Sequence, residues 1–315
     1  MEKLEQERHT RTGRTLAILY GLYVMNFGES SDPRVLVELA QEAEQSGWNG
    51  FFLTDALMYH ADGHEPATDT FVGLAAIASR TSRIRIGSAI AVLPRRLPWQ
   101  VAREAAAIDQ LSNGRLILGV GIGGETEVEY GRFGQKITPT VLGERLDESL
   151  DIITGLWSGE AFSYHGKHYQ IESARFSPTP VQRPRVPIWI GGSWPNKPPF
   201  RRAARWDGLI PIKHEKTINV EPNDLLEIKA FVAKYRRNTG PLDIAIVGNA
   251  PSKEQIESRR LEYERQGLIT WWLKYLPAYR NSIKEMHEQI KEGPPGVITS
   301  AVSAKGSEFR SEGAA

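Results

Sequence analysis

Residues 191–193 have the composition of an anion-binding segment. Gly191, Gly192 and Ser193 stand between an apolar run and a helical pattern. Backbone N–H groups at the start of a helix are free to bind an anion, and glycines let a ligand come close to the backbone. The segment therefore predicts a turn that could hold a phosphate, with a connecting turn without a ligand as the alternative.

A second glycine-rich segment follows another apolar run. Gly119, Gly121 and Gly124 match the spacing of a dinucleotide-binding fingerprint. That fingerprint requires a helix directly after the last glycine, whereas residues 125–139 are rich in charge and contain further glycines and a proline. A dinucleotide-binding fold is therefore disfavoured. The segment indicates either a turn with positive φ or a backbone that lies close to a flat ligand.

Histidines, tryptophans and glutamates allow structural as well as functional interpretations. His60 and His64 are four residues apart, but a glycine and a proline nearby place them in a loop, so no metal site is expected. Trp271 and Trp272, at the predicted end of the last strand, could stack on a cofactor ring or pack between strand and helix. Three acidic residues indicate a hydrated loop rather than an acid–base group: Glu125, Glu127 and Glu129.

Alternating strand and helix patterns must position these residues. Eight short apolar runs predict strands that are buried on both faces, as in a parallel sheet. They are residues 16–24, 50–54, 84–92, 115–120, 187–191, 208–212, 242–247 and 268–273. An amphipathic stretch follows each run, and the first of these helices should begin with Asp32 as its cap and Pro33 in its first turn.

Eight strand–helix units predict a single (β/α)8 TIM barrel of the α/β class rather than a doubly wound open sheet. In such a barrel the active site lies at the carboxyl ends of the strands. Residues 161–176 interrupt the alternation and predict a β-hairpin between the fourth helix and the fifth strand. Residues 1–15 and 293–315 lack periodicity, so we expect a barrel over residues 16–292 between two tails.

The composition excludes several classes of function. Lys and Arg number 39 against 38 Asp and Glu, so the net charge of +1 predicts neither a nucleic-acid nor a membrane partner. The longest stretch without a charged residue, 15–28, is too short to span a bilayer, and the first residues lack the apolar core of a secretion signal. The absence of cysteine excludes disulfides and thiolate chemistry. A cytoplasmic protein is expected.

Eight short motifs occur in a fixed order along the chain. They lie at residues 43–48, 52–55, 80–87, 111–116, 118–121, 156–159, 180–184 and 187–192. Together they resemble the bacterial luciferase-like monooxygenases, from about residue 21 to residue 212 and more loosely to the last helix. The resemblance implies a barrel that binds FMN or, in sister groups, the deazaflavin coenzyme. Such proteins oxygenate small organic substrates with dioxygen or transfer hydride.

The resemblance also implies a set of cofactor-binding residues. A bulge after the third strand falls at Ala89 and Ile90, where relatives hold a non-proline cis peptide against the flavin ring. Residues 191–193 match the family's phosphate-binding turn. Asp55 at the end of the second strand and Gly121 at the end of the fourth complete the set.

One position departs from the family. Relatives commonly have an acidic residue followed by histidine at the end of the second strand, near the reactive ring edge, whereas this chain has Asp55 and Ala56. Alanine cannot transfer a proton. His60 and Tyr59, the nearest candidates in sequence, are therefore the predicted catalytic residues, with His60 favoured because imidazole titrates near neutral pH. The alternative is that both are ordinary loop residues.

These observations predict a flavin-dependent oxidoreductase, specifically an FMN-using monooxygenase that oxidises a small organic substrate with dioxygen. Two alternatives stay open. One is a deazaflavin-dependent enzyme that transfers hydride; the other is a flavin-binding protein that has lost turnover. A separate flavin reductase and a homodimer are expected by analogy with the family.

Overall fold

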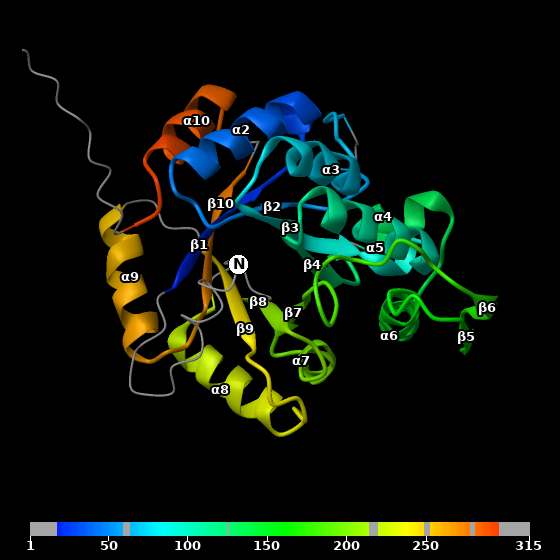
Figure 1. Ribbon diagram of the computed structural model, residues 1–315. Helices are drawn as coiled ribbons and strands as arrows, with labels where there is room; N and C mark the ends of the chain where they lie inside the picture. Colours follow the sequence, from blue (N-terminus) through cyan, green and yellow to red (C-terminus); the bar gives the residue numbers. More distant parts are fainter. Residues whose placement is uncertain are drawn as a thin grey trace, which may run out of the picture.

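The computed structural model describes residues 18–58, 64–124, 126–213, 220–248, 253–277 and 281–295. Within these residues, eight parallel strands close into a barrel in the order β1-β10-β9-β8-β7-β4-β3-β2, and helices surround it (Figure 1). The eight-unit barrel predicted from the sequence is confirmed, and the open sheet is excluded. The tail predicted at residues 1–15 lies outside the described residues.

The strands and helices alternate along the chain as the sequence predicts. The barrel strands are β1 (Leu19–Val24), β2 (Gly50–Leu53), β3 (Arg85–Val92), β4 (Leu116–Gly121), β7 (Ile188–Trp194), β8 (Gly208–Lys213), β9 (Asp243–Gly248) and β10 (Trp271–Leu276). The helices are α2 (Pro33–Gln45), α3 (Thr70–Arg80), α4 (Pro98–Leu111), α5 (Thr126–Glu129), α6 (Pro139–Leu156), α7 (Lys197–Ala203), α8 (Pro222–Ala233), α9 (Lys253–Arg265) and α10 (Ile283–Lys291). Within the described ranges, every helix is too short or too polar to span a bilayer.

The predicted insertion is an antiparallel hairpin of β5 (Phe162–His165) and β6 (Gln170–Ala174), placed between α6 and β7. It lies at the edge of the molecule beside α6 (Figure 1). Both carboxylate oxygens of Glu148 in α6 accept backbone N–H groups of the hairpin turn, among them that of Lys167 at 2.7 Å. The hairpin is therefore attached to the outside of the barrel and leaves the strand order intact.

Local sequence explains where the helices begin. Asp32 accepts the N–H of Arg34 at 2.8 Å, and Pro33 is the first residue of α2, as predicted. Thr138 and Ser282 cap α6 and α10 in the same way. Such side-chain acceptors satisfy N–H groups that the helix itself leaves free.

Three aromatic rings fill the interior of the barrel. The rings of Phe52, Trp189 and Trp271 lie 5.6 to 5.8 Å apart between centroids, and all three side chains are fully buried. Glycines on the inner wall leave room for them: a Cβ on Gly50 would lie 2.6 Å from the Phe52 ring, and one on Gly208 would overlap Trp189. The described interior is therefore packed with side chains, which leaves the mouth as the place where this barrel could hold a ligand.

The last barrel strand begins three residues later than predicted. The sequence predicts a strand over residues 268–273, but β10 starts at Trp271, because the preceding residues form the turn that follows α9. Trp271 and Trp272 consequently lie at the amino end of the strand, away from the mouth. Trp271 packs in the interior and Trp272 packs 5.9 Å from the ring of Tyr263 in α9. Cofactor stacking is wrong for this pair, and the packing alternative is confirmed.

Candidate active site

Strand β3 contains the predicted bulge. Against β4, Ser88 is paired with Leu118 and Ala91 with Val120, so β3 carries one extra residue over this stretch. The Ala89–Ile90 peptide inside it is cis, as predicted. The hydroxyl of Ser88 donates to the carbonyl oxygen of Gly119 at 2.7 Å and ties the bulge to the neighbouring strand.

Two glycines make room for the side chain of Ile90. A Cβ on Gly121, at the end of β4, would overlap Ile90 Cδ1. A Cβ on Gly191, in β7, would lie 2.7 Å from Ile90 Cγ2 and 3.2 Å from Cδ1. Ile90 is half-buried and packs against the aromatic interior. These three residues, from three neighbouring strands, therefore form one apolar surface at the mouth of the barrel.

The turn predicted at residues 191–193 is wrong. Gly191, Gly192 and Ser193 continue β7, which extends to Trp194, and pair with residues 210–212 of β8. Helix α7 begins only at Lys197, so these N–H groups do not form its first turn. The sequence pattern was misleading because glycines here serve close packing: a Cβ on Gly192 would lie 2.5 Å from Pro199 Cβ.

One polar atom at the end of β7 has no protein partner. The hydroxyl oxygen of Ser193 is buried and makes no hydrogen bond. A buried hydroxyl without a partner is unfavourable, and it marks a place where a ligand or water would supply the missing bond. Ser193 therefore remains a candidate for cofactor binding through its side chain, although its backbone belongs to a strand.

Asp55 holds the end of the bulged strand. Its carboxylate is buried at the end of β2 and accepts the N–H of Val92 at 2.8 Å and the hydroxyl of Thr70 at 3.1 Å. Arg95 and Arg96 pair with it at 2.7 and 2.8 Å. Burial raises the pKa of Asp55, but the two guanidinium groups and the Val92 N–H outweigh burial, so the pKa lies below its ordinary value.

Asp55→Asn should lower the free energy of unfolding by about 2 kcal/mol at pH 7. Breaking a buried ion pair completely costs about 3–5 kcal/mol. The expected loss is smaller here because Arg95 keeps Glu129 and Arg96 keeps Asp69 as a second carboxylate. Since the folded pKa of Asp55 is depressed, its contribution is present above the unfolded pKa of about 3.9 and is lost as the pH falls through the folded pKa. Urea titrations between pH 7 and pH 3 should therefore show that the free energies of unfolding of the unaltered protein and of Asp55→Asn approach each other as the pH falls.

The surface variant Asp151→Asn provides the control for that measurement. Asp151 pairs with Arg205, but the two side chains are 39% and 55% exposed. Its loss should change the free energy of unfolding by at most about 1 kcal/mol. An equal effect of both substitutions at pH 7 would contradict the role assigned to Asp55.

Arg95 joins three loops around the mouth. Its side chain is 5% exposed and bridges Asp55, after β2, to Glu129 of α5, after β4, at 2.7 and 3.1 Å. Arg96 bridges Asp55 to Asp69, the N-cap of α3, at 2.8 and 2.9 Å. Burial raises the pKa of Glu129, and Arg95 partly offsets it. The hydrated loop predicted for Glu129 is wrong, because the side chain is buried with a cationic partner.

Sequence reasoning missed both arginines. The available signal was their position: Arg95 and Arg96 directly follow a bulged strand, and Asp55 ends the adjacent strand. Strand ends meet at the same edge of a parallel barrel, so opposite charges at two neighbouring ends predict an ion pair. Glu127 is exposed as expected, and Glu125 lies outside the described residues.

Comparison with known proteins decides the family. A sequence profile described as luciferase-like monooxygenase matches residues 17–307. The chain belongs to this family. The resemblance seen in the short motifs is thereby confirmed.

The relatives of this luciferase-like chain include two types of enzyme. The oxygenase component of flavin-dependent trigonelline monooxygenase from Acinetobacter baylyi is 32% identical over 165 residues, 52% of this chain and 44% of that protein. An F420-dependent glucose-6-phosphate dehydrogenase from Nakamurella multipartita is 33% identical over 171 residues, 53% of this chain and 49% of the dehydrogenase. The matched stretch therefore spans less than half of either relative.

A solved structure shows the same fold. The F420-dependent secondary alcohol dehydrogenase in complex with an F420-acetone adduct is similar to the luciferase-like chain with a TM-score of 0.70. The match covers 89% of this chain and 99% of the dehydrogenase. Sequence identity is 15%, so this similarity concerns the barrel and its connections only.

The mouth of this luciferase-like barrel also carries two tyrosines that sequence reasoning missed. The rings of Tyr23 in β1 and Tyr275 in β10 lie 5.3 Å apart between centroids, above the aromatic interior. The hydroxyl of Tyr275 lies 2.8 Å from Met25 Sδ. Burial raises the pKa of Tyr23, and a hydrogen bond with the Thr54 side chain partly offsets that effect.

The predicted catalytic pair cannot be placed. Tyr59 and His60 lie outside the described residues. Ala56 is half-buried at the end of β2, next to the buried Asp55. The position at which the family resemblance implies a histidine therefore carries only a methyl group in this chain.

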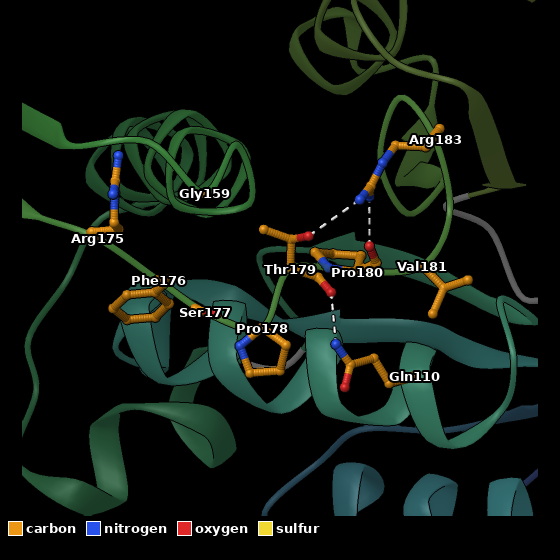
Figure 2. A pocket seen from close by; sticks show the side chains of 10 residues that line it. All are labelled: Gln110, Gly159, Arg175, Phe176, Ser177, Pro178, Thr179, Pro180, Val181 and Arg183. Carbon is orange, nitrogen blue, oxygen red and sulfur yellow. Dashed lines mark hydrogen bonds between the residues drawn. The ribbon is translucent and has the colours of Figure 1, made fainter.

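A surface hollow of about 710 Å³ lies at the other end of the luciferase-like barrel (Figure 2). It is lined mainly by residues 175–183, which lead into the amino end of β7. Two of its polar side chains bond within the protein: Arg183 donates to the Pro180 carbonyl oxygen at 2.5 Å, and Gln110 donates to that of Thr179 at 2.8 Å (Figure 2). The hollow is not part of the candidate active site.

Proposed function

We propose that this luciferase-like protein is a flavin-dependent oxidoreductase, and specifically an FMN-using monooxygenase that oxidises a small organic substrate with dioxygen. The observation that carries the proposal is the bulged segment at Ala89 and Ile90, at the mouth of a luciferase-like barrel. The flavin-dependent monooxygenase among its relatives supports a flavin as the cofactor.

The residues at the mouth fit a flavin. Ile90 offers an apolar surface to a flat ring, and the filled interior beneath it leaves no deeper position. The Ser193 hydroxyl is buried without a partner, so it can form a hydrogen bond with a polar ligand. We assign Ala89, Ile90 and Ser193 to cofactor contact. Gly192 faces Pro199, so it supports the strand instead.

Bound FMN would supply the electron transfer, which no side chain of this protein can provide. The protein's share is positioning, exclusion of water and control of protons. Ile90 would support the ring, and Asp55 keeps the bulge in place through the Val92 N–H. Asp55 acts on the cofactor through the backbone, because both of its carboxylate oxygens already have protein partners.

A stopped-flow experiment tests the proposal. Purified protein is mixed with reduced FMN or reduced deazaflavin coenzyme under anaerobic conditions, oxygen is added, and absorbance is followed. Tight binding of FMN with altered reoxidation supports a monooxygenase. Binding of FMN with reoxidation as in buffer favours a flavin-binding protein without turnover, and failure to bind either cofactor overturns the proposal.

The deazaflavin alternative rests on a specific observation. Several relatives that are 32–33% identical over about half of this chain are F420-dependent glucose-6-phosphate dehydrogenases. On this alternative the same mouth binds the deazaflavin ring and the protein transfers hydride without dioxygen. In the stopped-flow experiment, tight binding of the deazaflavin alone would select it.

His60→Ala should slow single-turnover reaction of the loaded enzyme by about 10²-fold, because general acid–base help of this kind is worth about 10² to 10⁴. Tyr59→Phe should have a smaller effect, since the phenol titrates far above neutral pH. Restoring the family residue with Ala56→His should partly compensate for His60→Ala. Full rate in both deletion variants, with a large gain in Ala56→His, would show that the histidine position is a true loss.

The proposed monooxygenase needs a source of reduced FMN. A separate flavin reductase fits a chain whose relative is the oxygenase component of a flavin-dependent monooxygenase. We further propose a cytoplasmic location and a homodimer. Multi-angle light scattering of the purified protein tests the dimer, and dependence of turnover on an added reductase tests the partner.

A further inference from the structure

We propose that Gly121 and Gly191 are positioning residues that set how far Ile90 stands out of the barrel mouth, and thereby the affinity for the flavin. This inference rests on the proposed function. It gives the two glycines a role that requires no contact with the cofactor, because their effect passes through one isoleucine side chain.

The side chain of Ile90 is enclosed by the two glycines. Its Cδ1 occupies the space that a Cβ on Gly121 would need, and its Cγ2 lies against Gly191, where a Cβ would come within 2.7 Å. The tightest contact of each glycine is therefore with a different methyl group of Ile90, and a Cβ on Gly191 would in addition lie 3.2 Å from Cδ1. A β-branched side chain has little freedom at χ1, so Cγ2 cannot turn away, whereas Cδ1 can swing about χ2.

Displacement of Ile90 into the barrel is blocked. Ile90 packs on the interior layer that contains Ala89, Ile117 and Trp189, all of which are buried. Packed interiors do not accept extra atoms without movement. A methyl group added at either glycine therefore moves the bulge toward the mouth, onto the surface assigned to the flavin ring.

The two contacts predict a specific pattern of rescue. Gly191→Ala should weaken FMN binding by about tenfold or more, and Gly121→Ala should weaken it less, by about threefold to tenfold. Ile90→Val removes Cδ1 and keeps Cγ2, so it should rescue Gly121→Ala and leave Gly191→Ala impaired. Ile90→Ala removes both methyl groups and should rescue both glycine variants, relative to Ile90→Ala alone.

The experiment is a fluorescence titration of the full-length chain and these variants with FMN, together with thermal unfolding without cofactor. Gly124→Ala is the matched control, because a Cβ there meets nothing within 4 Å. The unfolding data give a second readout: Gly121→Ala and Ile90→Val should be non-additive in the absence of cofactor, as expected for residues in contact.

The outcomes separate this inference from the proposed function. Unchanged FMN affinity in Gly191→Ala, or equal rescue of both glycine variants by Ile90→Val, overturns the inference while the proposed function stands. If the unaltered protein binds no FMN, the titrations are repeated with the deazaflavin coenzyme, to which the same pattern applies. Binding of neither cofactor by the unaltered protein overturns both.

Discussion

Arg95→Met is expected to lower the free energy of unfolding by about 3–5 kcal/mol, the usual effect of breaking a buried ion pair from one side. The substitution leaves Asp55 and Glu129, whose side chains are 2% and 6% exposed, without the guanidinium that joins them. Methionine occupies a similar volume, so the loss reports charge and not an empty space. Guanidinium chloride unfolding at pH 7 measures it.

Two further variants test the explanation for Arg95. Arg205→Met removes an arginine whose side chain is 55% exposed and should have an effect of at most about 1 kcal/mol. The double variant Arg95→Met/Glu129→Gln should recover part of the loss, because a neutral amide no longer needs the cation. A loss below about 1 kcal/mol in Arg95→Met would mean that the bridge does not hold the three loops together.

Gly119→Ala should destabilise the protein by about 3 kcal/mol, the upper part of the range for overpacking. A Cβ at this position would overlap the carbonyl oxygen of Ser88 in the adjacent strand. Backbone atoms of a barrel strand cannot rotate away as a side chain can, so β3 and β4 must separate where the bulge begins. Differential scanning calorimetry should show a lowered melting temperature.

Gly124→Ala is the control for Gly119→Ala. Neither glycine has a positive φ, so backbone strain does not distinguish them. A methyl group on Gly124 would meet no atom within 4 Å, so Gly124→Ala should leave the stability nearly unchanged. It could raise the stability slightly, because alanine reduces the flexibility of the unfolded chain. Similar melting temperatures for both variants would contradict the packing assigned to Gly119.

The sequence predicted the architecture well because barrel strands have a strong local signature. Apolar runs identified all eight strands, and the interruption at residues 161–176 identified the hairpin. The predicted bulge at Ala89 and Ile90 came from the family resemblance and not from the pattern of residues. Errors arose where a local pattern has two physical causes: glycines at 191–193 fit a turn as well as a closely packed strand.

The candidate site was harder to predict because its contacts join distant residues. Arg95 is 40 residues from Asp55 in number and contacts it only after the barrel closes. Glu129 was misjudged because the surrounding segment is charged, and nothing local shows that one of its carboxylates is buried. Tyr23 and Tyr275 face each other only because the first and last described strands are neighbours.

The aromatic packing of Phe52, Trp189 and Trp271 closes the barrel from below. A cofactor and a substrate that meet at the mouth must then use one shared entrance. The kinetic consequence is a compulsory order of binding, in which the molecule that lies deeper has to enter first and leave last. For the proposed monooxygenase, steady-state rates should pass through a maximum and fall at high substrate concentration, because substrate that arrives early blocks the way for reduced flavin.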